Sequence, residues 1–276
     1  MSPGAGRFRG RCKAILAAML AMVTSVAVTA ACDDRSLAAQ AAYLSNSSEW
    51  FEFNAAGREL VHETGTLQGM ELAMDLRCAD WQWQGAVALF DGVRRYDGET
   101  SMGVPVISQS AIRQLHGHVQ TTLPVSDAWR LGARLSGQTL WRDIASAGGA
   151  TGYSERYEWM LASLGAQWRS GLGPGQIMLA LWTGTALQSG MLLSHPSFAQ
   201  TRLPLGSITQ YELSAGWRTR WRAAWSLQLE AAYRQTDMAQ GAQAILTRSG
   251  VPVGVAHQPR TSMVDMPLGV RINYEF

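Results

Sequence analysis

The chain has 276 residues, of which 47% are hydrophobic and 16% charged, and its formal net charge is +2. A charge so close to balance gives no reason to expect nucleic acid as a partner. Beyond the N-terminus, no segment is apolar over the roughly 20 residues that a membrane-spanning helix needs. The most apolar stretch, IMLALW at 177–182, has the length of a β-strand. The sequence therefore excludes a protein that crosses a bilayer with helices after its N-terminal segment.

The N-terminal segment has the layout of a secretory signal peptide. Basic residues come first, the uncharged stretch AILAAMLAMVTSVAV follows, and the small residues of VTAAC suit cleavage after Ala30 or Ala31. The uncharged stretch is also shorter than a transmembrane helix requires. We therefore predict a cleaved signal peptide at 1–30. Its basic residues are Arg7, Arg9, Arg11 and Lys13.

The residues after the cleavage site are small and polar, and they show no hydrophobic period. We interpret 31–48 as a periplasmic lead-in to one domain at 49–276. Acylation of Cys32 would instead make a lipoprotein, but Thr29 stands where lipoprotein motifs usually carry Leu. A disulfide between Cys32 and Cys78 is expected, because the exported chain enters an oxidising compartment.

From residue 49 onward the chain repeats one unit, a segment of about ten residues with alternating side chains, then a turn that is alternately short and long. In the segment 69–78, Met70 and Leu72 lie on one face and Glu71 and Asp75 on the other. Successive side chains of a strand point to opposite faces, so each segment has an apolar and a polar face. The segments are 49–61, 69–78, 81–90, 109–123, 128–142, 157–168, 176–187, 210–221, 225–234 and 264–276.

This repeat predicts an all-β fold, a transmembrane antiparallel up-and-down β-barrel of ten strands. A barrel of eight strands is the alternative count, because the segments 49–61 and 109–123 alternate weakly. A secreted β-sandwich is the alternative fold, since its half-buried strands alternate in the same way.

The aromatic residues favour the barrel over the sandwich. Amphipathic rings settle at the two surfaces of a bilayer, so a transmembrane barrel carries one aromatic girdle at each end of its apolar band. One group of aromatic residues lies beside the short turns and a second beside the long loops. The first group is Trp81, Trp129, Trp168, Trp221, Trp225 and Phe276, and the second is Phe90, Trp141, Tyr157, Tyr211 and Tyr233.

The last strand ends on the sequence LGVRINYEF, with apolar residues at alternate positions up to Phe276. Together with the signal peptide and the even strand count, this ending resembles that of Gram-negative outer-membrane β-barrel proteins over residues 49–276. The resemblance implies that Tyr274 and Phe276 form the signal read by the barrel-assembly machinery. It also implies a cell-envelope protein of the outer membrane, a monomer that contacts membrane lipid and lipopolysaccharide.

The polar faces of the strands carry charges of both signs, which would point into the lumen. The interior of a barrel of this size can be largely filled by side chains. Buried charges are costly unless paired, so we expect a network of Arg–carboxylate pairs. A narrow pore favouring anions is the alternative. The network is predicted to contain Glu71, Asp75, Arg77, Arg130, Arg134, Arg142, Glu212, Arg218, Arg220, Glu230, Arg234, Arg271 and Glu275.

A ten-stranded barrel also resembles the omptin proteases, which implies carboxylates and a His–Asp pair at the outer rim. This chain has acidic residues and histidines in suitable segments, but none forms a motif with the spacing of a catalytic site. The pair His116 and His118 lies on one strand face and lacks the further ligands of a typical metal site. No cofactor or metal is therefore expected. The rim candidates are Asp91, Asp97, Glu99, Asp143, Glu155, His195, Asp237 and His257.

Three long inserts, at 92–108, 189–209 and 236–261, are long enough to form an external surface, and loops of this length are commonly functional. We therefore expect a non-catalytic barrel with a packed polar lumen that serves envelope structure or surface interaction. A narrow anion-favouring channel and an omptin-like or lipid-modifying hydrolase at the rim are the alternatives.

Overall fold

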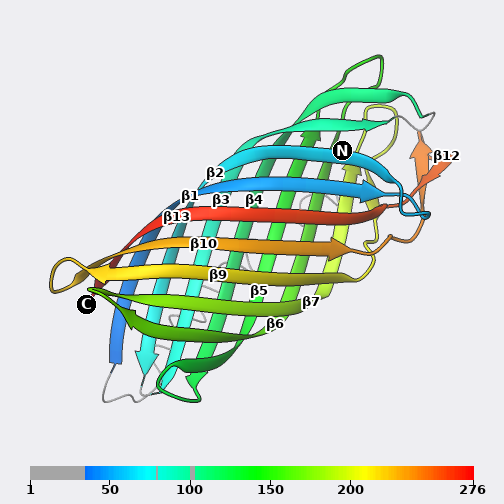
Figure 1. Cartoon of the computed structure of the whole chain (residues 1–276). Coiled ribbons are helices and arrows are strands. Elements are labelled where there is room, and N and C mark those ends of the chain that lie inside the picture. The colour runs from blue at the N-terminus through cyan, green and yellow to red at the C-terminus, as the bar shows by residue number, and fades with distance from the viewer. Residues whose placement is uncertain (1–34, 79, 100–102) are drawn as a thin grey trace.

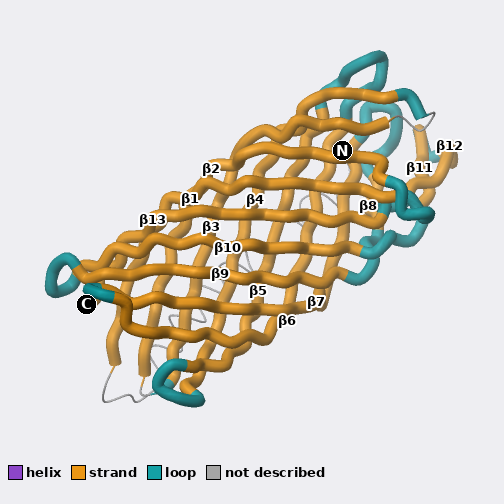
Figure 2. The backbone as a smooth tube through the Cα atoms, in the orientation of Figure 1, coloured by secondary structure: helices purple, strands orange, loops and turns teal. Residues whose placement is uncertain are grey.

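The computed structural model describes residues 35–78, 80–99 and 103–276. These residues form a closed antiparallel β-barrel (Figures 1 and 2). Consecutive strands pair along the chain, and β1 pairs with β13 to join the two ends. The barrel strands are β1 (Arg35–Phe53), β2 (Glu59–Cys78), β3 (Trp81–Glu99), β4 (Pro105–Pro124), β5 (Trp129–Ile144), β6 (Tyr153–Leu172), β7 (Gly175–Ser194), β9 (Ile208–Arg220), β10 (Trp225–Met238) and β13 (Arg260–Glu275).

The predicted ten-stranded up-and-down barrel is confirmed. The sheet has eleven strands, and one of them, β8 (Thr201–Leu203), is a three-residue strand beside β7. Without β8, ten long strands form the ring, so the eight-stranded alternative is wrong. A separate hairpin of β11 (Ala244–Arg248) and β12 (Val251–Ala256) stands at the loop end of the barrel (Figure 1). Ser249 and Gly250 both have positive φ, as the tight turn between these two strands requires.

The beginning of the barrel differs from the expectation. Residues 35–48, expected in a periplasmic lead-in, form most of β1, and the expected first strand at 49–61 spans the turn between β1 and β2. The side chains of β1 are small on both faces, as at Ala39, Ala41 and Ala42, so they lack the strong alternation that marks the later strands. Backbone pairing with β2 and β13 makes this segment a strand all the same.

The strands are also longer than the alternating segments suggested. A transmembrane β-strand needs about 9–11 residues, whereas β2 and β4 each have 20. Much of the inserts expected as loops at 92–108, 189–209 and 236–261 is therefore strand. The side-chain period of two continues through these extensions, but the outward-facing residues become polar, as at Asp91 and Arg95.

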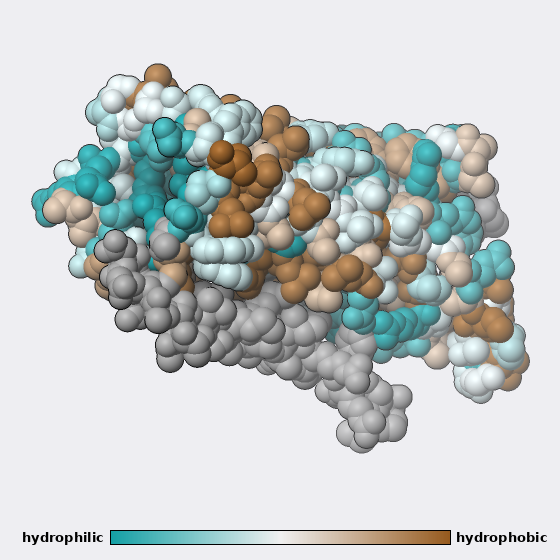
Figure 3. Space-filling model, turned by 90° about the horizontal axis from the view of Figure 1, so that it is seen from below, coloured by the Kyte–Doolittle hydropathy of each residue, from teal (hydrophilic) through white to brown (hydrophobic). Residues whose placement is uncertain are grey.

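The outer surface of the barrel carries an apolar band. Exposed Leu, Met, Val and Ile side chains cover the middle of the barrel wall, among them Leu72, Leu164 and Leu268. Figure 3 shows hydrophobic residues gathered across the middle of the visible face and hydrophilic residues at its left end. In β13 the even-numbered side chains Leu268 and Val270 are exposed, while Arg271 and Asn273 are buried, so the predicted orientation of this strand is confirmed.

The aromatic residues only partly follow the predicted girdles. Trp81, Trp129, Trp221, Trp225 and Phe276 are exposed beside the short turns, and Tyr211 and Tyr233 are exposed toward the loop end. Phe90 and Tyr157, which were assigned to the second girdle, are buried and point inward. The assignment failed because position along the chain does not reveal the face of a strand. Within the described ranges, no helix is long and apolar enough to cross a bilayer.

Candidate functional site in the barrel lumen

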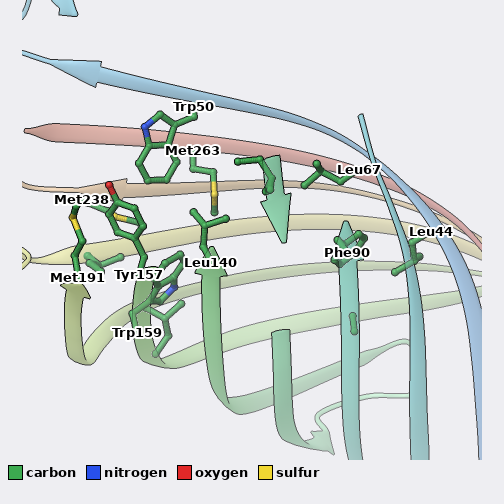
Figure 4. Packing of buried hydrophobic residues seen from close by; sticks show 14 of the residues in the cluster. Leu44, Trp50, Leu67, Phe90, Leu140, Tyr157, Trp159, Met191, Met238 and Met263 are labelled. Carbon is green, nitrogen blue, oxygen red and sulfur yellow. The ribbon is translucent and has the colours of Figure 1, made fainter. Parts of the chain in front are cut away.

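The half of the lumen nearer the loops is filled by a continuous cluster of buried side chains, which we call the apolar plug (Figure 4). Every one of the ten barrel strands contributes to it. The apolar plug consists mainly of Trp50, Leu67, Phe90, Ile112, Leu140, Tyr157, Trp159, Leu161, Met191, Leu203, Ile208, Met238 and Met263.

Side chains from opposite walls touch within the apolar plug. The rings of Trp50 on β1 and Tyr157 on β6 meet edge to face, with centroids 5.1 Å apart. These two strands stand five places apart in the ring of ten and therefore face each other across the lumen. Gln114 on β4 donates to the sulfur of Met263 on β13 at 3.9 Å, a second contact between distant strands. The walls thus meet across the lumen at this level.

A buried ionic cluster centred on Arg142 packs against the apolar plug. The Nη1 of Arg142 lies 2.8 Å from Glu52 Oε1 and 2.5 Å from Glu155 Oε2, and its Nη2 lies 2.9 Å from Glu63 Oε1. The guanidinium also lies 5.1 Å from the centroid of Trp50. One fully buried side chain of β5 therefore ties together β1, β2 and β6.

The Arg142 cluster has an excess of negative charge. Arg94 is its second guanidinium, with Nη1 3.7 Å from Glu63 Oε2, so two cations face three carboxylates. The pKa of Glu155 is raised to about 7, because burial and the nearby charge of Glu52 together outweigh the opposing effect of Arg142. Glu155 is therefore the carboxylate of the cluster that takes up a proton near neutral pH.

The half of the lumen nearer the short turns is polar. Arg271 on β13 binds two carboxylates, with Nη1 2.7 Å from Glu71 Oε1 and Nη2 2.7 Å from Glu230 Oε1. Its Nη1 also donates to Gln40 Oε1 at 3.0 Å, and Gln40 in turn donates to Asp75. This chain of contacts links β10, β13, β1 and β2 along one wall.

A second group, formed by side chains of β5, β9 and β10, has the opposite composition, one carboxylate between two guanidiniums. Glu212 lies 2.7 Å from Arg134 Nη1 and 2.8 Å from Arg234 Nη2. The guanidinium of Arg134 stacks over the ring of Trp182 at 4.2 Å. A Cβ atom at Gly165 would lie 2.4 Å from this ring, so glycine leaves the space that Trp182 occupies.

Arginines gather at the level of the short turns. Arg218 and Arg220 share Glu275, at 3.3 Å and 3.2 Å, and Arg130 Nη2 donates to the backbone oxygen of Asp80 at 2.7 Å. The exposed side-chain fraction rises from 16% at Arg218 to 66% at Arg220. The polar half of the lumen is therefore open to solvent at this end.

Among the residues that the structure describes, two further arginines of this region have no carboxylate partner. Arg169 donates from Nη2 to Gln82 Oε1 at 2.9 Å and to Gln167 Oε1 at 3.2 Å, both neutral groups. Within residues 35–78, 80–99 and 103–276, neither Arg169 nor Arg77 forms an ion pair. Both line a cavity of about 220 Å³ in the polar half of the lumen.

All thirteen residues predicted for the lumen network lie on inward-facing positions of their strands, but they fall into separate groups. Arg142 belongs to the loop-end cluster, and the other twelve lie in the polar half. The sequence interpretation missed Arg94 and Arg169, and it placed Glu155 among the rim candidates instead of in the lumen, because these residues lie where loops or a turn were expected. It also missed Glu52 and Glu63, at the two ends of the turn between β1 and β2. The continued period of two in these segments was the signal that could have found them.

The rim candidates for catalysis do not come together. Glu155 is buried beside Arg142, Asp91 pairs with Arg113 at 3.3 Å on the outside, and Glu99 pairs with Arg58 at 2.5 Å. The other candidates, Asp97, Asp143, His195, Asp237 and His257, form no His–carboxylate ion pair in the described parts of the chain.

The histidines have other partners. The ring of His195 stacks on Phe198, with centroids 4.8 Å apart, and its Nδ1 accepts a hydrogen bond from the backbone of Ser197. His116 and His118 both face the lumen, with rings 5.7 Å apart. Among the residues that the structure describes, no group of three or more His, Cys, Asp or Glu could hold a metal ion.

The remaining predicted residues lie near the short turns. Phe276 is 73% exposed, its backbone donates to Leu37 O at 2.9 Å, and its ring meets Tyr274 edge to face. Cys78 ends β2 and is disulfide-bonded. Cys32 lies outside the described residues, so its pairing with Cys78 stays a prediction, as do the signal peptide at 1–30 and its cleavage.

Comparison with solved structures shows that the fold is that of outer-membrane β-barrels. The outer-membrane protease OmpT from Escherichia coli superimposes with a TM-score of 0.60 and 10% sequence identity, covering 90% of this chain and 99% of that chain. The translocator domain of the autotransporter NalP from Neisseria meningitidis gives a TM-score of 0.44 and 12% identity, covering 98% and 99%. No protein-family profile and no curated protein sequence matches this chain.

Proposed function

We propose that this chain is a monomeric, non-catalytic barrel of the Gram-negative outer membrane whose lumen is closed and whose loop end is a surface for interaction outside the cell. The contact between Trp50 and Tyr157 across the lumen carries the proposal. Aromatic rings that meet from opposite walls, with apolar side chains of all ten strands around them, support a lumen that is filled by side chains at this level.

The apolar band supports the membrane location. A transmembrane barrel has an outward-facing apolar band about 25 Å tall. A 20-residue strand such as β2 rises about 50 Å along the barrel axis, at ~3.3 Å per residue and a tilt of ~40°. Such a strand crosses the bilayer and continues beyond it. Because the short turns lie next to the band, we assign them to the periplasm and the strand extensions to the outside.

The loop end supports a role in surface interaction. The strand extensions raise the loops well above the membrane, and the β11–β12 hairpin stands at their tip (Figure 2). Its side chains Ile245, Val251 and Val255 are each about 60% exposed. Exposed apolar residues that cluster on one element are typical of contact sites for other molecules.

Planar-bilayer recording of the purified protein tests the closed lumen. We expect no steady single-channel steps from the unmodified barrel. The double variant Trp50→Ala and Tyr157→Ala removes both rings of the cross-lumen contact and should produce measurable conductance, whereas Tyr211→Ala removes an outward-facing ring and should not. Steady conductance by the unmodified barrel would overturn the proposal.

A separate assay addresses catalysis. The purified barrel is expected to leave peptides and lipid A intact over long incubations. Cleavage of either substrate that disappears in His195→Ala or His257→Ala would replace the non-catalytic proposal with a hydrolase at the rim.

A further inference from the structure

The polar half of the lumen contains a cavity of about 220 Å³ between the apolar plug and the short turns. A water molecule occupies about 30 Å³ of liquid, so the cavity has room for several waters or for one small organic ion. Seven glutamines line it, together with His116, His118 and several charged side chains. These groups offer both hydrogen-bond donors and acceptors to whatever fills the space.

The lining of the cavity carries an excess of positive charge. Four carboxylates line it, and three of them, Glu71, Glu212 and Glu230, are bound by arginines as described above, while Asp75 accepts from Gln40. Six arginines minus four carboxylates leaves an excess of two positive charges. The six arginines are Arg77, Arg134, Arg169, Arg218, Arg234 and Arg271.

The unmatched charge is concentrated at one place. Arg77, Arg169 and Arg218 come from β2, β6 and β9, yet all three act electrostatically on the same carboxylate, Asp75. Arg218 already has Glu275 as a partner. Arg77 and Arg169 have no carboxylate of their own within the described residues, and Arg169 is held in place by two glutamine side chains.

Two buried polar atoms of the cavity lining also lack partners among the described residues. The Nδ1 of His118 and the Oδ1 of Asp75 are buried, and in the described part of the chain neither has a hydrogen-bond partner. Buried polar atoms are almost always hydrogen-bonded in folded proteins. Their arrangement around a cavity therefore indicates a polar occupant, either ordered water or a ligand with hydroxyl or acidic groups.

We propose that this cavity is a binding site for a small oxyanion carrying about two negative charges, a phosphate or a dicarboxylate, held by the guanidiniums of Arg77 and Arg169. The planar guanidinium fork matches both phosphate and carboxylate oxygens. The ligand enters past the short turns, where Arg220 is exposed, because the apolar plug fills the other end. That this opening faces the periplasm rests on the proposed function.

Isothermal titration calorimetry on the purified, folded barrel tests the site, with inorganic phosphate and succinate as probes in separate titrations and chloride as the monovalent comparison. We expect saturable binding of phosphate or succinate near one site per barrel and none of chloride. The probe that binds with the higher affinity identifies the chemistry of the ligand. Arg169→Gln should weaken the binding at least tenfold, since a charge-assisted contact is lost.

The matched control is Arg113→Gln, which makes the same change at an exposed arginine on the outside of β4, paired with Asp91. It should leave binding unchanged. Arg77→Gln lies at the solvent-exposed mouth and provides a second variant if Arg169→Gln does not fold, as judged by heat-modifiable migration on gels. Absence of saturable binding, or equal weakening by Arg113→Gln, would overturn the site. Conductance is recorded separately, so a conducting barrel that still binds phosphate would overturn only the closed lumen.

Discussion

The two halves of the lumen are built from the same alternating strands and both contain arginines and carboxylates, but they use them differently. Around Arg142 the charges are enclosed by the apolar plug, and the guanidinium is fully buried. Around Arg218 and Arg220 the charges border a cavity and are partly open to solvent. The comparison shows that the alternation of apolar and polar residues along a strand specifies which side chains face inward. The size and polarity of those side chains decide whether that part of the lumen holds water.

The strongest test of this difference is removal of the central cation from each half. Arg142→Met leaves three buried carboxylates around an apolar side chain and should destabilise the barrel by about 3–5 kcal/mol. Arg134→Met leaves Glu212 with Arg234 next to the cavity and should cost clearly less. The free energy of unfolding by urea in lipid vesicles measures both. Equal losses of unfolding free energy would show that the loop-end half of the lumen is as hydrated as the half nearer the short turns.

The boundary between lumen and lipid can be tested with one charge placed on either side. Val270→Arg puts a guanidinium in the apolar band and should cost about 2–4 kcal/mol in the same unfolding measurement. Ser214→Arg puts it into the cavity on the inward face of β9 and should cost less. Gly269 is a poorer inward control, because a Cβ atom there would lie 2.5 Å from Leu44. A greater loss of unfolding free energy from Ser214→Arg than from Val270→Arg would show that the inward and outward faces are assigned the wrong way round.

The buried ionic cluster around Arg142 predicts a pH dependence of the stability of the barrel. The pKa of Glu155 is raised from 4.5 to about 7, chiefly by burial. A raised folded-state pKa means that the stabilising contribution is complete below the unfolded pKa and is lost as pH rises through about 7. Unfolding free energies of the native chain should therefore fall between pH 4.5 and 7 relative to Glu155→Gln, whose side chain stays neutral. Parallel pH profiles of the two proteins would contradict this assignment.

The smallest effect on stability is expected at the chain end. Phe276 is mostly exposed, so its deletion should change the unfolding free energy by less than about 0.5 kcal/mol. Because we assign the residue to recognition by the assembly machinery, the amount of folded barrel in the outer membrane of cells should fall. Quantifying both on the same variant separates packing from assembly. A large loss of stability in vesicles would assign Phe276 to packing instead.

Much of the fold could be read from local patterns. The alternation in segments such as 69–78 and 225–234 predicted the class, the strand count and the inward face, because a strand buried on one side needs one apolar and one polar face. The same reasoning failed at 35–48, where small residues on both faces carry no such signal. It also failed at Phe90 and Tyr157, which were placed by their position along the chain and not by their face.

The sequence alone determined which residues face the lumen in each alternating segment, because the two-residue period of a strand is a local property of the backbone. Only the tertiary structure decided which of them meet. Trp50 and Tyr157 are more than a hundred positions apart in the sequence. Arg142 pairs with Glu52 and Glu63, which lie on strands at least three places from its own in the ring. Such contacts depend on the closure and register of the ring, which bring opposite walls together, so they determine where the lumen is dry and where it can hold a ligand.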